Sequence, residues 1–333
     1  MSKLLGRVFM SRIHTILNPE LFQGNGKRRH YFEGWYFKLT GRDEHAAVAA
    51  IPGIALGETR DSPDSHSFVQ FIWGDRTFYF RYPLDAFRSG SRAFGVAVGG
   101  NQFCFNGISL CLENEEGCAA GELSFSDVLP FPKTALYPGI MGPFGYVPFM
   151  ECYHGIVSVR HNIGGQLSVF GQTLDFNGGT GYIEKDWGSA FPSCWAWVQA
   201  NHFRDGAAFL FSVAEIPWLG RSFTGFFSFL YTGGEFYRFA TYTGARIARL
   251  AGRGGGLEGV IRDGRRRLEF FAKPGPTGML KAPKHGLMDR VIEESLSAQV
   301  HVRLTDREGA TLFEGTSGHG GMERFDAGKL LTR

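Results

Sequence analysis

Trp195-Ala196-Trp197-Val198-Gln199-Ala200-Asn201 is a segment in which large or polar side chains alternate with small apolar ones. Alternation with a period of two residues predicts a β-strand whose two faces differ. Gly-rich and Asn-Gly turn signals separate the segments of this kind, and helical periodicity is weak throughout, with residues 2–16 and 287–294 as the best candidates for a helix. The sequence therefore predicts an all-β fold. The same period recurs in residues 31–39, 67–73, 77–82, 207–215, 223–231 and 297–305.

The composition also favours many short strands. Aromatic residues make up 15% of the chain, with 32 Phe, and such residues prefer half-buried pleated surfaces. The 47 Gly and 14 Pro residues supply the turns between strands. Because 333 residues exceed what one hydrophobic core usually holds, we expect two domains.

A weak internal repeat indicates how the chain divides into two domains. Acidic, Trp-containing segments begin at Glu33 and at Tyr182, and hairpins of similar length follow each of them. Short antiparallel strands must cover their edges, and closure into a barrel does so. We therefore predict two lipocalin-like (calycin-type) antiparallel β-barrels in tandem, at residues 31–178 and 179–333, after an N-terminal extension at residues 1–30. One large β-sandwich is the alternative fold.

Charge and cysteine content argue against several classes of function. The net charge is +3, and the basic clusters at residues 27–29 and 262–267 come without a nucleic-acid-binding motif, so we expect no nucleic-acid partner. The five cysteines form no CxxC or Cys/His group, and residues 1–16 lack the apolar core of a signal peptide. No stretch reaches the ~18 apolar residues of a membrane span. We expect a cytoplasmic protein with reduced thiols.

The sequence also lacks motifs for metals, cofactors and nucleophilic catalysis. The ten histidines show no HxH or HExxH spacing, and GxSxG does not occur. The Gly-rich residues 252–259 do not join a strand to a helix, which argues against a phosphate loop. We therefore expect no metal site and no cofactor.

Residues 128–150 differ from the rest of the chain because they contain five prolines and a single charge, Lys133. Prolines remove ladder donors, so this segment cannot be a regular strand. A loop of this length in a compact protein is usually functional or a linker. It is expected to cap a cavity or to touch a membrane peripherally, with an apolar linker between the domains as the alternative.

The segment around Glu184 contains two carboxylates on one side of a predicted strand. Residues two apart share a face, so Glu184 and Asp186 point one way and Lys185 and Trp187 the other. Two carboxylates in one enclosed site repel each other, so one can stay protonated and act as an acid. The alternative is that all three charged residues form salt bridges at a barrel rim.

The next predicted strand has an unusual face with two indoles and two amides, namely Trp195, Trp197, Gln199 and Asn201. This mixture suits a cavity that holds an apolar ligand and orients it with a few polar groups. The alternative is that the indoles fill a barrel core. Near the start of the first domain, Glu33 and Trp35 again place a polar group and an indole on one face of a predicted strand, with Tyr36 on the opposite face. We expect these three residues to bind ligand as well.

These segments resemble motifs of the tocopherol cyclase family, over nearly the whole chain from about Tyr31. The motifs are Phe32-Glu33-Gly34-Trp35-Tyr36-Phe37-Lys38, Gly181-Tyr182-Ile183-Glu184-Lys185-Asp186-Trp187-Gly188, Phe191-Pro192 and Trp195-Ala196-Trp197-Val198-Gln199-Ala200-Asn201. The resemblance implies paired lipocalin-like barrels, as in the related carotenoid hydratases. It departs at Asp186, where plant-type members carry Asn.

The resemblance also implies a reaction, in which a prenylated benzoquinol is cyclised by protonation of its alkene and attack by its phenol oxygen. Such a step needs a neutral acid in a dry pocket lined by aromatic faces. We expect Asp186 or Glu184 to donate the proton for cyclisation or hydration, and Trp187, Trp195 and Trp197 to face the cation. The alternatives are a carrier of prenylquinones or other lipophilic molecules without turnover, and a carbohydrate-binding protein.

Overall fold

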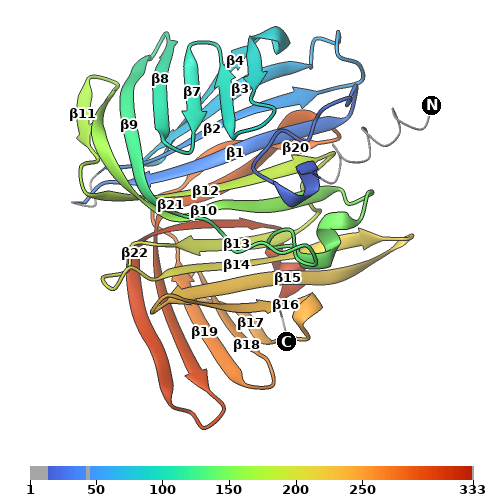
Figure 1. Cartoon of the computed structure of the whole chain (residues 1–333), viewed down its shortest axis with the longest axis vertical. Helices are drawn as coiled ribbons and strands as arrows, with labels where there is room; N and C mark the ends of the chain where they lie inside the picture. Colours follow the sequence, from blue (N-terminus) through green and yellow to red (C-terminus); the bar gives the residue numbers. More distant parts are fainter. Residues whose placement is uncertain (1–13, 43–45, 332–333) are drawn as a thin grey trace.

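Strands form nearly all the regular structure of residues 14–42 and 46–331, which this computed structural model describes (Figure 1). The all-β prediction is confirmed. Residues 14–17 are helical, and the remainder of the helix predicted at residues 2–16 lies outside the described residues. The helix predicted at residues 287–294 is wrong, because these residues begin the long strand β21 (Leu287–Asp306) and pair with β20 (Gly278–Lys284).

The first sheet contains every strand between Tyr31 and Gly188 and has the order β4-β3-β2-β1-β12-β10-β9-β8-β7-β6-β5, with β11 paired to β10. Its neighbouring strands are antiparallel. The bounds are β1 Tyr31–Thr40, β2 Ala47–Leu56, β3 His66–Trp73, β4 Arg76–Tyr82, β5 Phe87–Ser89, β6 Gly95–Val98, β7 Asn101–Cys104, β8 Gly107–Asn114, β9 Gly117–Leu129, β10 Cys152–Val169, β11 Gln172–Asp175 and β12 Gly179–Gly188.

The second sheet is also antiparallel, with the order β16-β15-β14-β13-β22-β21-β19-β18-β17 and β20 paired to β21. The bounds not yet given are β13 Trp195–Ala200, β14 Ala208–Trp218, β15 Arg221–Thr232, β16 Glu235–Ala240, β17 Arg246–Arg253, β18 Gly256–Arg262, β19 Arg266–Lys273 and β22 Thr311–Phe325. Short 3₁₀ helices lie at Leu84–Ala86 (η1), Gly142–Tyr146 (η2), Thr241–Thr243 (η3) and Ala327–Leu330 (η4).

Each sheet curls around an apolar core of its own, as the prediction of two lipocalin-like units requires (Figure 1). The change from one sheet to the other falls between Gly188 and Trp195. The predicted boundary at residue 178 comes before β12, which instead pairs with β1 and β10 of the first sheet. The second sheet therefore opens with β13.

A third apolar cluster lies between the two sheets and joins them. It contains Tyr36 of β1 and Tyr182 of β12 from the first sheet, and Trp195 and Trp197 of β13 from the second. The hairpin formed by β20 and β21 adds to this contact, because Gln70 of β3 exchanges hydrogen bonds of 2.8 Å with the backbone of Lys281. The central strands are therefore buried on both faces, which positions their polar side chains between the sheets.

No helix within the described parts of the chain is long and apolar enough to cross a membrane.

Candidate active site

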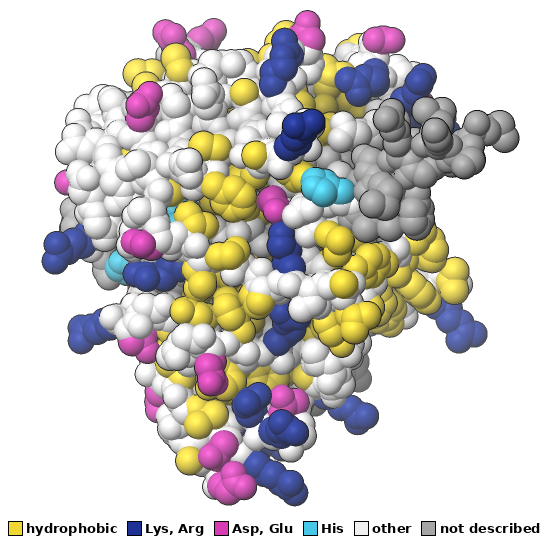
Figure 2. All heavy atoms as spheres, viewed as in Figure 1, with side chains coloured by type: hydrophobic (Ala, Val, Ile, Leu, Met, Phe, Trp, Pro, Cys, Tyr) yellow, Lys and Arg dark blue, Asp and Glu magenta, His cyan; other side chains and the backbone are white. Residues whose placement is uncertain are grey.

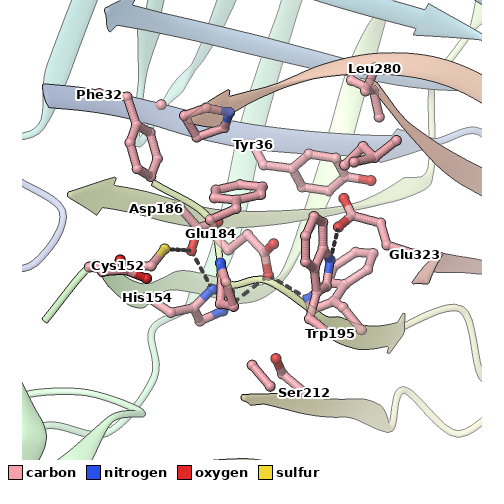
Figure 3. A pocket seen from close by; sticks show the side chains of 18 of the residues that line it. Phe32, Tyr36, Cys152, His154, Glu184, Asp186, Trp195, Ser212, Leu280 and Glu323 are labelled. Carbon is pink, nitrogen blue, oxygen red and sulfur yellow. Dashed lines mark hydrogen bonds and ion pairs between the residues drawn. The ribbon is translucent and has the colours of Figure 1, made fainter. Parts of the chain in front are cut away.

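A cavity of about 160 Å³ lies where the central strands of the two sheets face each other (Figure 3). Most of its wall is apolar or aromatic. Gly34 has no side chain between those of Phe32 and Tyr36 on β1, and this leaves room opposite its ladder partner Asp186. The titratable groups that line the cavity are Tyr36, Glu151, Cys152, His154, Glu184, Asp186, Lys281, Glu294 and Glu323.

β12 carries the two carboxylates predicted from the sequence. Its alternation directs Tyr182, Glu184 and Asp186 toward the second sheet, while Ile183 packs in the core of the first. Tyr182 donates a hydrogen bond of 2.6 Å to Glu184, and the Trp197 indole donates one of 3.1 Å to the same oxygen. The structure thus brings Glu184 and Asp186 to one face, as predicted.

His154 of β10 lies between these two carboxylates (Figure 3). Its Nδ1 is 2.8 Å from Asp186 Oδ1, and its Nε2 is 3.3 Å from Glu184 Oε2. Burial lowers the pKa of His154, but attraction to the two carboxylates and hydrogen bonding to them outweigh this effect and raise the pKa to about 10. The ring is therefore an imidazolium at neutral pH.

The same three residues are groups that ligate metals, with ligand atoms within 4.8 Å of one another. Both nitrogens of His154, however, already face a carboxylate. Binding a cation through His154 would require loss of the ring proton and exchange of one of these contacts. The geometry fits a clamped imidazolium better than an open set of ligands.

β13 directs its two indoles toward the first sheet, while Ala196, Val198 and Ala200 pack in the core of the second. The predicted faces of this strand are confirmed. The cavity beside Trp195 and Trp197 lies between the two sheets, however, and not inside either barrel. The aromatic wall therefore forms from the outer surfaces of both curled sheets.

Glu323 of β22 and Glu294 of β21 complete the acidic side of the cavity, and neither was predicted as a site residue. Trp195 Nε1 donates a hydrogen bond of 2.9 Å to Glu323 Oε2. Burial, with added repulsion from Glu184 and Asp186, raises the pKa of Glu323 to about 8 despite that hydrogen bond. Glu323 is therefore mainly a neutral carboxylic acid at pH 7.

Glu294 is fully buried, and the Tyr36 hydroxyl donates a hydrogen bond to its Oε1. Burial, followed by repulsion from Glu323, raises its pKa well above the usual value for a glutamate. Its Oε2 has no hydrogen-bond partner among the described residues. The period of β21 contained a signal for this position, because the apolar Ile292 and Leu296 lie two residues away on either side.

Lys38 is a buried basic residue beyond Glu294. Its Nζ donates a hydrogen bond of 2.5 Å to the carbonyl of His319. Burial lowers the pKa of Lys38 to about 7, although Glu294 opposes this shift. Gln199 and Asn201 are also buried between the sheets but do not line the cavity, and Asn201 donates a hydrogen bond of 2.8 Å to the carbonyl of Gly181.

Glu33, Trp35 and Trp187, which were predicted to bind ligand, do not line this cavity, although Trp187 lines a larger cleft beside it. Trp35 is in the core of the first sheet, and Glu33 Oε1 forms a buried ion pair of 2.5 Å with Lys185. The Lys185 ammonium lies 4.7 Å from the ring centres of both Trp35 and Trp187. It also donates hydrogen bonds to the carbonyls of Pro19 and Leu21, so this group anchors the N-terminal segment.

A larger cleft of about 880 Å³ lies outside the cavity, between residues 15–31 and residues 135–154. Met141, Met150, Glu151 and His154 line both spaces. Residues 128–150, predicted to cap a cavity or touch a membrane, thus contribute to the wall of each. The cleft and the acidic cavity thus share a wall that residues of this apolar segment help to form.

Comparisons with known proteins agree with this architecture. The model of the family described as tocopherol cyclase-like matches residues 137–324. No curated protein matches the chain at a significant level.

Solved structures with a similar fold share little sequence with the chain. CghA has 12% identity and a TM-score of 0.56, covering 89% of this chain and 88% of its own. A protein described as AttH from Nitrosomonas europaea has 14% identity and a TM-score of 0.50, covering 90% and 93%. Kievitone hydratase from Nectria haematococca has 11% identity and a TM-score of 0.48, covering 88% of each chain. The first two show the fold alone.

Proposed function

The chain belongs to the tocopherol cyclase-like family, and we propose that it catalyses acid-promoted addition of an O–H group to a prenyl alkene in the cavity between its two sheets. The observation that carries this proposal is Glu323, a carboxylic acid with a pKa of about 8 in an aromatic-lined cavity. Protonation of an alkene requires an acid that is still neutral at the working pH. The family and the apolar wall together support a small lipophilic substrate.

The proposed reaction needs no oxidant or reductant. Glu323 transfers its proton to the less substituted alkene carbon, the π bond supplies the electron pair of the new C–H bond, and a tertiary cation remains. An oxygen of a phenol in the same molecule, or of a water molecule, then forms the C–O bond. The proton released by that oxygen returns to the Glu323 carboxylate, so cyclisation leaves the composition unchanged and hydration adds one water.

Aromatic rings surround the place where the positive charge would develop. Trp195 and Phe191 meet edge to face with ring centres 5.4 Å apart, and Tyr36 and Trp197 do so at 5.6 Å. Ring faces attract cations by about 0.5–2 kcal/mol each, and more when water is excluded. These four rings therefore favour the cation over the neutral alkene.

Asp186 and Glu184, expected from the sequence to be the donors, are proposed to have a different role. Each holds one nitrogen of His154, so the three form a fixed network beside the cavity. The network can orient the attacking hydroxyl or water by hydrogen bonding. Glu323 is the better donor because its carboxyl stays protonated without a cationic partner, with Glu294 as the adjacent source of protons.

The cavity also limits which part of a substrate reaches the acid. A cavity of about 150 Å³ in another protein holds one benzene molecule, so about 160 Å³ holds roughly one isoprenyl unit. We assign the reacting alkene to this cavity and the remainder of the molecule to the outer cleft. This assignment leaves both cyclisation and hydration open, because their first step is the same.

Turnover in deuterium oxide tests the proposal directly. The purified chain is incubated with prenylated benzoquinols and prenylated phenols, and the masses of the products are measured by mass spectrometry. Protonation by a solvent-exchanged acid places one non-exchangeable deuterium on carbon, in a cyclised product or in a water adduct. Intact substrate after incubation with every member of the panel would reject the proposal.

Carriage without turnover is the second candidate, and the mainly apolar wall of the cavity favours it. It predicts that the same molecules quench Trp195 and Trp197 fluorescence on binding and are recovered unchanged. Binding with no deuterium on carbon would therefore support a carrier.

A further inference from the structure

Large apolar side chains are exposed together beside the opening of the outer cleft. Leu136, Phe149 and Leu219 are 74%, 61% and 80% exposed, and Tyr137 and Tyr146 are more than a third exposed. Figure 2 shows apolar side chains gathered at this edge, at the level of η2 and of the turn between β14 and β15 in Figure 1. We call these five residues the rim patch.

The rim patch has a fixed shape because its two segments pack on each other. Phe149 and Phe144 of the loop lie 5.6 Å and 6.1 Å, between ring centres, from Trp218 of the hairpin. Tyr242 also holds the loop, because its hydroxyl donates a hydrogen bond of 2.6 Å to the carbonyl of Ile140. The exposed side chains are therefore presented on an ordered surface.

Leu219 is an unfavourable residue for its position in two respects. It has a φ of +48° and Gly220 a φ of +79°, as in the tight hairpin turns that favour Asn-Gly. A leucine in this conformation costs of order 1 kcal/mol or more, and it exposes its side chain to water besides. The exposure of so large an apolar side chain on a strained turn is consistent with a contact outside the fold.

The charges around the rim patch are mostly positive. Lys133 is the single charge in residues 128–150, and Arg221 is the single charge in residues 216–223. Exposed Lys27 and Arg29 line the cleft, together with the half-buried Glu151. Glu20 is paired with Lys133 at 2.9 Å, and this pair contributes no net charge.

We propose that the rim patch docks the protein onto the surface of an anionic lipid bilayer. Exposed Leu and Phe side chains enter the boundary between headgroups and acyl chains, tyrosines prefer the interface, and nearby Lys and Arg attract anionic headgroups. The patch adjoins the cavity, because Met141 and Met150 of the loop and Ile216 and Pro217 of the hairpin line it. A lipophilic ligand would thus pass from the bilayer to the cavity without crossing water.

Co-sedimentation with vesicles tests this docking independently of turnover. The full chain should sediment with phosphatidylcholine–phosphatidylglycerol vesicles and more weakly with phosphatidylcholine alone. The double variant Phe149→Glu/Leu219→Glu should bind about tenfold or more weakly, because two apolar contacts are replaced by charges. Leu312→Glu is the matched control. Leu312 is also an exposed leucine, at 43%, but it lies at the start of β22 and outside the rim patch, so this variant should leave binding unchanged.

Arg221→Glu provides a second variant that leaves the apolar side chains in place. It should weaken binding to the anionic vesicles and leave binding to phosphatidylcholine unaltered. No sedimentation of the full chain, or equal binding by the double variant, would overturn the proposal. So would dimers that the double variant dissociates, because a second copy of the chain would then cover the patch.

Discussion

Glu294 of β21 lies directly opposite Glu323 of β22 in their antiparallel ladder. Like charges at opposed positions repel, and burial makes the repulsion stronger. The structure therefore holds this pair with at least one proton at neutral pH, and Trp197 is the ladder partner of Glu323 on the other side. Two buried carboxyl groups and an aromatic side chain thus lie side by side across three strands.

Replacing Glu323 with Gln should abolish turnover while preserving ligand binding. The amide keeps the size of the side chain but has no acidic proton, so the rate should fall about a hundredfold or more. Rates with a prenylated benzoquinol or phenol, and ligand quenching of Trp fluorescence, measure the two effects. Glu314→Gln is the control, because Glu314 is half exposed elsewhere on β22.

The same assay on Glu294→Gln separates the two acids. If Glu294→Gln is inactive and Glu323→Gln is active, Glu294 is the donor and our assignment within the pair is reversed. Full activity in both variants would exclude the pair as the source of the proton.

The pH dependence of activity should respond to the Trp195 indole. Activity should decline above about pH 8 as Glu323 loses its proton. The Trp195 hydrogen bond lowers the pKa of Glu323, so Trp195→Phe should raise that pKa and move the alkaline decline upward by about one pH unit. Trp218 lies outside the cavity, so Trp218→Phe should leave the pH of the alkaline decline unchanged. If Trp195→Phe also left it unchanged, a group other than Glu323 would control the decline.

The raised pKa of Glu323 also predicts how stability changes with pH. Between 4.5 and about 8 the folded chain keeps a proton that the unfolded chain has released. The free energy of unfolding of the wild type therefore falls as pH rises through this range. Its slope against pH corresponds to at most one proton. Glu323→Gln lacks this term, so it should become progressively more stable than the wild type.

Urea unfolding of both proteins across that range measures the difference. Groups that do not interact with Glu323 cancel in the comparison, whereas Glu294 does not, because repulsion from Glu323 contributes to its raised pKa. The stabilising contribution of His154 is lost only as pH rises from 6.5 toward about 10. Glu314→Gln should keep a constant difference from the wild type. A Glu323→Gln difference that stays constant as well would show that Glu323 is not protonated in the folded chain.

Local periodicity predicted the parts of the site that a single strand determines. The two-residue period placed Glu184 with Asp186, and Trp195 with Trp197, because side chains on a strand alternate whatever the strand packs against. It also indicated curled antiparallel sheets. It could not show that Glu33 and Trp35 lie outside the cavity, because the sequence indicates which residues share a face of a strand but not what that face packs against.

The remaining parts depend on contacts between distant strands. Glu294 and Glu323 meet Trp197 only through the order β13-β22-β21, and His154 meets Asp186 only through the pairing of β10 with β12. Glu294 and Glu323 belong to one hairpin, but three register shifts between its turn and these residues keep their pairing from being counted off along the sequence. The cavity between the sheets could not be predicted either, because it exists only after both sheets have folded and packed together.

The buried ion pair of Glu33 and Lys185 should support stability and not ligand binding. Both side chains are fully buried, so Lys185→Met leaves an unpaired carboxylate and should lower the free energy of unfolding by about 3–5 kcal/mol. The double variant Lys185→Met/Glu33→Leu should recover part of that loss. Urea unfolding measures both, and ligand quenching of Trp fluorescence should be unchanged where the variants are folded.

Arg76→Met provides the matched control for this pair. Arg76 and Glu116 are 3.0 Å apart with side chains 48% and 59% exposed, so their separation should cost at most about 1 kcal/mol. If Lys185→Met kept its stability but lost ligand binding, the pair would belong to the site after all. The opening motif around Glu33 would then act on the ligand and not, as its contacts indicate, on the attachment of residues 19–23 to the first sheet.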